Sequence, residues 1–124
     1  MVIQSAIGGA ILLVVVLQST SICVAQTRKD VTLHGELVDI VGFVSSGAKQ
    51  DADAVSKSAK AGNPIGFYDT KARKVYVVGL PQVNRGANET LMPYVGLRVF
   101  ITGKIYTKNG VSVILMHDIG KSIK

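Results

Sequence analysis

The stretch that decides the fold is residues 97–119, LRVFITGKIYTKNGVSVILMHDI. In its first half, apolar residues at odd positions, such as Val99 and Ile101, alternate with polar or aromatic residues at even positions. This period of two predicts a strand with one buried face. Asn109-Gly110 interrupts the pattern, and an Asn-Gly pair between two such runs predicts a β-hairpin.

The length of the hairpin turn sets which residues lie opposite each other. A two-residue Asn-Gly turn would place the odd positions of one strand opposite the even positions of the other. A three-residue turn with Gly110 in a bulge would pair odd with odd, keeping one apolar face on both strands. We therefore expect the three-residue turn, and its register pairs Ile105 with Val113, Ile101 with His117 and Val99 with Ile119.

Upstream of the hairpin, the sequence predicts three more strands and two helical segments. We expect a long first strand over 31–44, bent by a bulge near Gly35 and Gly42, and then a helix up to Ala61. Asp51 would cap this helix, Gly62 and Pro64 would end it, and Ala52, Val55 and Ala59 would form its buried stripe. Further strands are expected over 64–68 and 74–80, with a helical turn over 91–95. This is the element order of a mainly β, five-stranded OB-like barrel with a short helix inserted after the first strand.

Residues 1–25 have the layout of a secretory signal peptide. Ala6 to Leu17 carries no charge, and Cys23-Val24-Ala25 precedes a polar segment, which predicts cleavage between Ala25 and Gln26. The expected location is exported, in the periplasm, with residues 26–124 forming a single domain. Two alternatives remain open: residues 6–25 could stay as an uncleaved membrane anchor, because this length is near the minimum for spanning a hydrocarbon core, or Cys23 could be lipidated.

Charge and cysteine content narrow the chemistry of the domain. All 14 Lys and Arg and all 8 Asp and Glu lie after position 25, so the domain carries the whole net charge of +6. Such a balance suits either an anionic envelope ligand or simple solubility. Because the single cysteine, Cys23, lies in the leader, the domain has no disulfide and no thiolate metal site.

Several short motifs resemble those of a loosely described group of small exported bacterial proteins with an OB-like barrel and no settled activity. The resemblance covers about Val31 to Ile119. In that group, cysteines commonly stand where this chain has Gly42, Ala54 and Ser58, so the soft-metal or redox site that the resemblance would imply cannot be carried over. The motifs that carry the resemblance are Leu37-Val38-Asp39-Ile40, Gly47-Ala48-Lys49, Gly62-Asn63-Pro64-Ile65-Gly66-Phe67, Pro93-Tyr94-Val95-Gly96-Leu97-Arg98-Val99 and Thr102-Gly103-Lys104-Ile105-Tyr106.

The sequence gives no support for a catalytic or metal centre. His34 and His117 are the only histidines, and two nitrogen ligands do not make a zinc site. We expect His117 to face inward and His34 to lie on the polar face. The carboxylates within the strand segments are Glu36, Asp39 and Asp118, without a nucleophile or metalloprotease motif beside them. No enzyme activity, catalytic residue, cofactor or metal is therefore expected.

The fourth strand offers the best candidate for a ligand surface. Basic and aromatic residues alternate on its even positions, as in a reader of anionic ligands. The loops beside it add Lys49, Lys57 and Lys60. We expect an exported, non-enzymatic binding or interaction module of the bacterial cell envelope whose partner is a protein or an anionic envelope ligand; export argues against nucleic acid. The alternatives are a membrane-tethered form of the same domain and a degenerate metal or redox protein. The expected surface residues are Arg98, Phe100, Thr102, Lys104, Tyr106 and Lys108.

Overall fold

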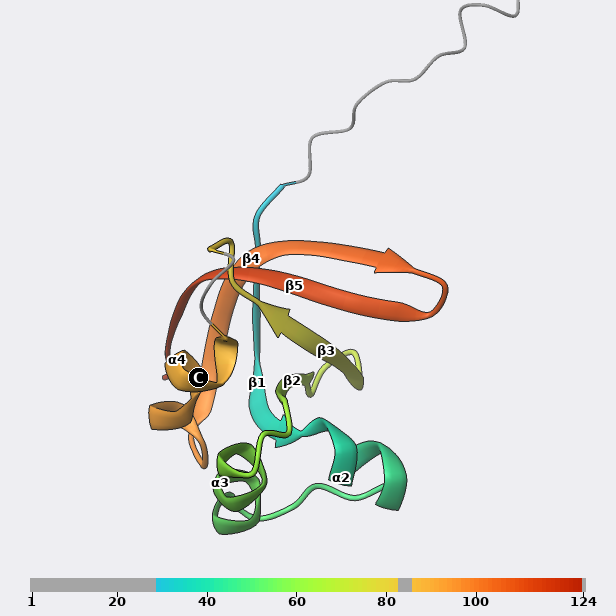
Figure 1. Cartoon of the computed structure of the whole chain (residues 1–124). Helices are drawn as coiled ribbons and strands as arrows, with labels where there is room; N and C mark the ends of the chain where they lie inside the picture. Colours follow the sequence, from blue (N-terminus) through green and yellow to red (C-terminus); the bar gives the residue numbers. More distant parts are fainter. Residues whose placement is uncertain (1–28, 83–85, 124) are drawn as a thin grey trace, which may run out of the picture.

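The computed structural model describes residues 29–82 and 86–123 (Figure 1). Five strands form a closed barrel in the order β1-β2-β3-β5-β4. All neighbours are antiparallel except β3 and β5, which are parallel. This confirms the mainly β fold with a small OB-like barrel. The elements are β1 (Val31–Asp39), α2 (Ile40–Ser46), α3 (Ala52–Lys60), β2 (Ile65–Asp69), β3 (Lys74–Gly79), α4 (Ala87–Leu91), the 3₁₀ turn η1 (Met92–Tyr94), β4 (Arg98–Lys108) and β5 (Val111–Lys121).

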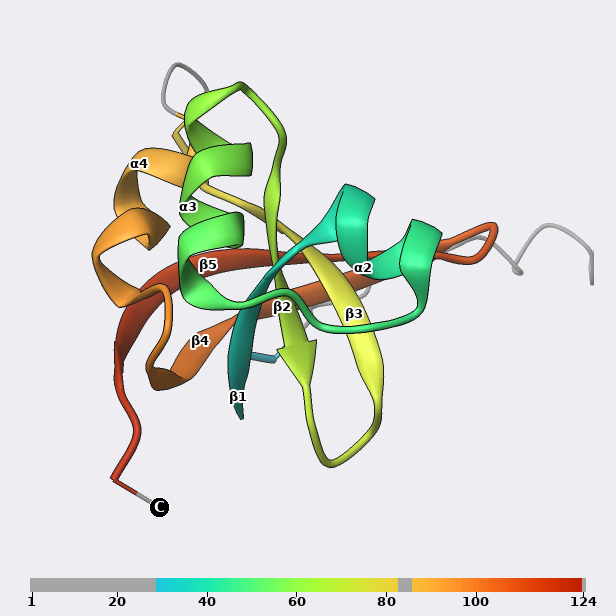
Figure 2. The same ribbon diagram turned by 90° about the horizontal axis from the view of Figure 1, so that it is seen from below.

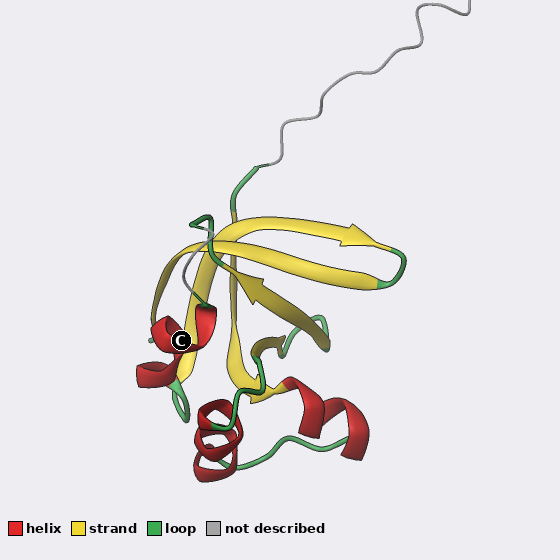
Figure 3. Ribbon diagram, in the orientation of Figure 1, coloured by secondary structure: helices red, strands yellow, loops and turns green. Residues whose placement is uncertain are grey.

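The core fills the barrel and extends to helices α3 and α4, which pack beside β1 and β2. Figure 3 shows the helices beside the strands. Val55 and Ala59 of α3 and Leu91 of α4 belong to this core, although both helices are short. Burial of such side chains is the main stabilising term, because a chain without disulfides has no covalent cross-link. The buried core residues are Leu37, Val55, Ala59, Ile65, Phe67, Tyr76, Val78, Leu91, Val99, Ile101, Ile114 and Met116.

The first strand is shorter than the sequence predicts, because residues 40–46 form helix α2 rather than a continuation of the strand. The prediction of a bulged strand through Val44 is therefore wrong. The apparent change of phase is a change from a period of two to helical spacing, with Ile40 and Val44 four residues apart. Gly66 of β2 makes room for the new direction, since a Cβ there would lie 2.4 Å from Ile40 Cγ1.

Helix α3 is capped as the sequence predicts. The Asp51 side chain accepts a hydrogen bond from the Ala54 N–H at 2.8 Å. Val55 and Ala59 are buried, whereas Ala52 at the start of the expected stripe is exposed. The helical turn before β4 also exists but begins earlier than expected, at Ala87.

The hairpin has a two-residue turn at Asn109-Gly110, so the prediction of a three-residue turn is wrong. Lys108 pairs with Val111, and Asn109 and Gly110 have φ values of 51° and 86°, as a two-residue type I′ turn requires. Odd positions of β4 therefore face even positions of β5, and Ile105 pairs with Ile114, not with Val113.

The bulge that brings odd positions of β4 opposite odd positions of β5 lies within the strands rather than at the turn. The pairing shifts between Thr102 and Gly103, after which Ile101 faces Ile119. A Cβ at Gly103 would lie 2.1 Å from the Leu115 carbonyl oxygen, so the close approach needs glycine. Near the turn, the core face of β5 consists of even positions such as Ile114, and His117 is exposed rather than inward-facing.

Asn88 ties α4 to the start of β2. Its Oδ1 accepts from the Ile65 N–H at 2.9 Å, and its Nδ2 donates to the Asn63 carbonyl oxygen at 2.8 Å. Asn88 is thus a half-buried clamp between two elements.

No helix within the described residues is long and apolar enough to cross a membrane. The expected leader, its expected cleavage site at Ala25 and Gln26 and the alternative anchor over 6–25 lie outside those residues.

Candidate functional site

The expected surface residues lie on one strand but do not form one site. Arg98 and Lys108 stand at opposite ends of the 11-residue strand β4, which at about 3.3 Å per residue separates them by roughly 33 Å. Phe100 lies near the start of the strand, and the centre of its ring is 6.3 Å from that of the His34 ring. Lys104 pairs with Asp30 at 2.8 Å. Only Tyr106 and Lys108 lie together at an open part of the surface.

That open part is the outer side of β3, β5 and the tip of β4. The pairings place Val77 beside Val113 and Val113 beside Tyr106, and their side chains share one face because all three lie on the outward phase of their strands. Val75 and Val111 lie on the same phase as Val77 and Val113, two residues earlier. We call Val75, Val77, Val111, Val113 and Tyr106 the valine face.

Helix α2 covers the neighbouring part of the barrel. Ile40 sits over Gly66, and the Phe43 and Tyr68 rings lie 5.1 Å apart. Gly66 pairs with Val77 across the sheet, so α2 borders the valine face on one side. In Figure 1, β3 lies between the β4–β5 hairpin and α2, and Figure 2 again shows the hairpin and α2 on the same side of the barrel.

Exposed apolar side chains gather on this side of the molecule. Val77 and Tyr106 are 38% exposed and Val111 is 56% exposed, while Val41 and Val44 on α2 reach 51% and 68%. These are five of the seven exposed large hydrophobic residues in the part of the chain that the structure describes. A gathered apolar surface, unlike scattered single residues, is typical of a binding site.

The valine face is hollowed at the hairpin. A cavity of about 350 Å³ is lined by Tyr106, Thr107, Lys108, Val111 and Val113. Val111 and Val113 supply its aliphatic part, and Thr107 and Lys108 are among its polar lining residues. This hollow is where two of the expected surface residues meet apolar residues that the sequence analysis did not select.

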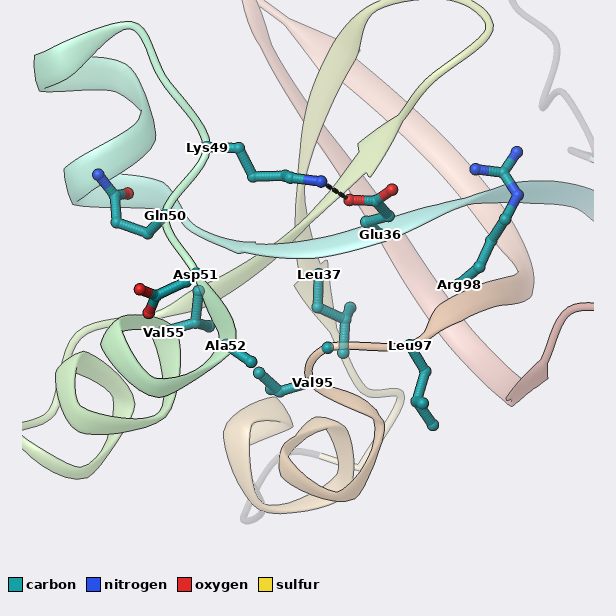
Figure 4. A pocket seen from close by; sticks show the side chains of 11 residues that line it. Glu36, Leu37, Lys49, Gln50, Asp51, Ala52, Val55, Val95, Leu97 and Arg98 are labelled. Carbon is teal, nitrogen blue, oxygen red and sulfur yellow. Dashed lines mark hydrogen bonds and ion pairs between the residues drawn. The ribbon is translucent and has the colours of Figure 1, made fainter.

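A second hollow lies under the loop between α2 and α3 (Figure 4). It has a volume of about 410 Å³ and an apolar floor that includes Leu37 and Val55. Lys49 from the loop forms an ion pair with Glu36 of β1 across its top. Arg98 and Asp51 also line it, so its two cations are balanced by two carboxylates, and no charge preference follows.

The two histidines occupy separate positions with separate partners. His34 Nδ1 lies 2.9 Å from Ser122 Oγ, and His117 Nε2 lies 2.8 Å from Asp30 Oδ2. Among the described residues, no three His, Cys, Asp or Glu side chains are grouped as metal ligands would be. Exposed His117 and half-buried His34 therefore each form a hydrogen bond with a separate partner.

The three strand carboxylates do not converge either. Glu36 and Asp39 are three residues apart on β1, which directs them to opposite faces. Asp39 is buried, and its Oδ1 has no hydrogen-bond partner. Asp118 is exposed on β5, where it pairs with Thr102. This arrangement lacks the neighbouring acid and base that acid–base catalysis requires.

Within the described residues, side-chain pKa values are clearly shifted at two places. The hydrogen bond from Lys104 lowers the pKa of Asp30, and the same bond raises the pKa of Lys104. Burial inside the barrel, with a smaller effect from the Asp69 charge, raises the pKa of Tyr76. Tyr76 is buried in the barrel, and Asp30 contacts His117, which lines a separate hollow of about 300 Å³.

No family model, curated protein or solved structure matches this chain. The fold and the geometry of its surface therefore carry the functional argument alone.

Proposed function

We propose that this chain is an exported, non-enzymatic OB-like module of the bacterial cell envelope that binds its partner through the valine face. The observation that carries the proposal is the gathering of exposed Val77, Val111 and Tyr106 at and beside a hollow on the hairpin. Exposing such side chains to water is unfavourable by about 25 cal/mol for each Å² of apolar surface, and a bound partner would recover that free energy. Export is supported by the leader sequence and its cleavage pattern at Ala25 and Gln26.

The place of this face in the barrel supports the same proposal. OB barrels commonly bind ligands on a sheet face between the loop after the first strand and the loop joining the fourth and fifth. Here the first of those loops carries α2 and the second is the turn at Asn109-Gly110, and the valine face lies between them.

The proposal is tested by site-specific photo-crosslinking in the cells that make the protein. A photoreactive side chain at Val77 should give a discrete crosslinked product in the envelope fraction, because this position would lie against the partner. The same group at Lys57, which is exposed on α3 away from the valine face, is the control. Equal labelling at both positions, or recovery of the protein from the cytoplasm with the leader intact, would contradict the proposal. Intact mass of the purified protein separates the cleaved, anchored and lipidated forms.

A further inference from the structure

The shape of the valine face favours a chain-like occupant over a flat one. β3 and β5 are paired only over Val77–Gly79 of β3, and the hairpin continues beyond that ladder to its turn at Asn109 (Figure 1). The space beside the hairpin is the 350 Å³ hollow. A membrane surface or another flat sheet would bridge over such a hollow, whereas a single extended segment can lie in it.

The side chains of the valine face favour a partner with aliphatic side chains. Val75, Val77, Val111 and Val113 present branched methyl groups, and Tyr106 is the one aromatic residue of the face. Single-stranded nucleic acid is bound mainly by stacking bases on successive aromatic side chains. The four valines and one tyrosine of the valine face offer little stacking area but pack well against Val, Ile or Leu side chains.

The three segments that frame the face carry charge of one sign, and Asp69, just before the second of them, is buried. These segments, residues 40–50, 70–79 and 103–116, contain six of the fourteen Lys and Arg but none of the eight Asp and Glu. Lys49 and Lys104 form ion pairs with Glu36 and Asp30, which come from outside these segments. The other four have no ion pair with any described residue; they are Lys71, Arg73, Lys74 and Lys108.

This one-sided charge excludes a second copy of the chain as the natural occupant, because two such faces would bring like charges together. Basic residues stand on both arms of the surface: Lys108 is on the hairpin, and Lys71 and Arg73 lie in the β2–β3 turn. Lys74 shares the phase of Tyr76 instead, and its ammonium lies 5.4 Å from the centre of that ring. That turn is held firmly, since the Asp69 carboxylate accepts from two of its N–H groups. Acidic groups on an occupant would therefore meet cations on either side of the aliphatic floor.

We infer that the valine face binds an extended, acidic segment of another protein, in which aliphatic side chains alternate with Asp or Glu. The inference rests on the proposed function and names the partner class for that same site. In an extended segment, alternate side chains point to opposite sides. The aliphatic set would enter the hollow, while the acidic set would stay at the solvent-facing rim, within reach of the lysines.

The test uses the full chain and three fluorescein-labelled ten-residue peptides. One alternates Val with Glu, one alternates Ser with Glu, and one alternates Val with Lys. In fluorescence anisotropy, the Val–Glu peptide should bind at least about tenfold more tightly than either control peptide, a difference that corresponds to one well-buried pair of side chains. Its affinity should fall as NaCl is raised, because exposed charges are screened over about 8–10 Å at physiological ionic strength.

Matched variants locate the binding. Val77→Ser and Lys108→Glu should each weaken binding of the Val–Glu peptide by about fivefold. Leu97 has the same 38% exposure as Val77 but lies directly before β4, at the end away from the hairpin turn. Leu97→Ser and Lys57→Glu on α3 should leave binding unchanged. These exposed positions allow folding, which circular dichroism verifies for each variant.

The outcomes distinguish a failure of the acidic-segment partner from a failure of the proposed binding function. Equal binding of the Val–Glu and Ser–Glu peptides, tighter binding of oligothymidine or phosphatidylglycerol vesicles, or equal effects of Lys108→Glu and Lys57→Glu would overturn the acidic-segment partner. If that happens while Val77 still crosslinks specifically in the envelope, the proposed function stands and only the partner class falls. Loss of the Val77 crosslink would remove the function itself.

Discussion

Replacing Asn88 with alanine should destabilise the barrel without touching its core. The substitution removes both hydrogen bonds of the clamp, leaving the Ile65 N–H and the Asn63 carbonyl oxygen without their partner. A net intramolecular hydrogen bond contributes about 0.5–1.5 kcal/mol, and an unsatisfied buried group costs about 1–3 kcal/mol. Because Asn88 is only half-buried, water reaches part of the site, and we expect a loss of about 2 kcal/mol in the free energy of unfolding.

Equilibrium urea unfolding followed by far-UV circular dichroism measures this loss. At constant slope, the midpoint of Asn88→Ala should fall, and its Tm should drop by about 8–16 °C, since 1 kcal/mol corresponds to about 4–8 °C in a domain of this size. Asn88→Asp keeps the acceptor for the Ile65 N–H but loses the donor to Asn63, so its loss should be intermediate. Gln82→Ala removes an exposed amide and serves as the control. If Asn88→Ala unfolds at the same urea concentration as Gln82→Ala, the clamp contributes nothing and the reasoning is refuted.

Three further predictions concern the bulge at Gly103 and the shifted pKa values of Asp30 and Tyr76. Gly103→Ala should lower the free energy of unfolding by about 3 kcal/mol, because its Cβ would lie 2.1 Å from the Leu115 carbonyl oxygen; an unchanged urea midpoint would contradict this. Lys104 lowers the pKa of Asp30 below its ordinary value of 3.8 in the folded state, so the stability from Asp30 is present above pH 3.8 and is lost as the pH falls through the folded pKa. The stability difference between wild type and Asp30→Asn should therefore shrink on acidification, and a constant difference would refute the linkage. Burial raises the pKa of Tyr76 above its ordinary value of 10.0, so its contribution is complete below pH 10.0 and is lost as the pH rises through the folded pKa; ultraviolet titration of Tyr76→Phe should lack the latest tyrosine step.

The sequence by itself determined the elements that depend on local patterns. Alternation along residues 97–119 and the Asn109-Gly110 pair defined the terminal hairpin, and Asp51 followed by Val55 and Ala59 defined α3 with its cap. These features depend on side-chain period and on backbone preferences within a few residues, which the sequence displays directly. The strand count and order then followed, and with them the OB-like barrel.

The register of the hairpin was decided by tertiary structure. The choice between two turns depended on which face of β5 is buried, and both phases of that strand are apolar near its middle, so the pattern could not decide. The bulge at Gly103 allows a two-residue turn at one end and an Ile101–Ile119 pairing at the other. The sequence contains Gly103, but it does not indicate that the backbone there lies against the Leu115 carbonyl oxygen.

The same limit applies to the candidate site. Tyr106 and Lys108 were found from the alternation of one strand, but Val75 and Val77 come from a strand more than 25 positions earlier in the chain. They join the surface only because β3 lies parallel to β5, a contact that no local pattern encodes. Likewise, residues 40–46 have both apolar alternation and helical spacing. The helix forms where the missing side chain of Gly66 gives Ile40 a place to pack, so a residue distant in sequence decides the local structure.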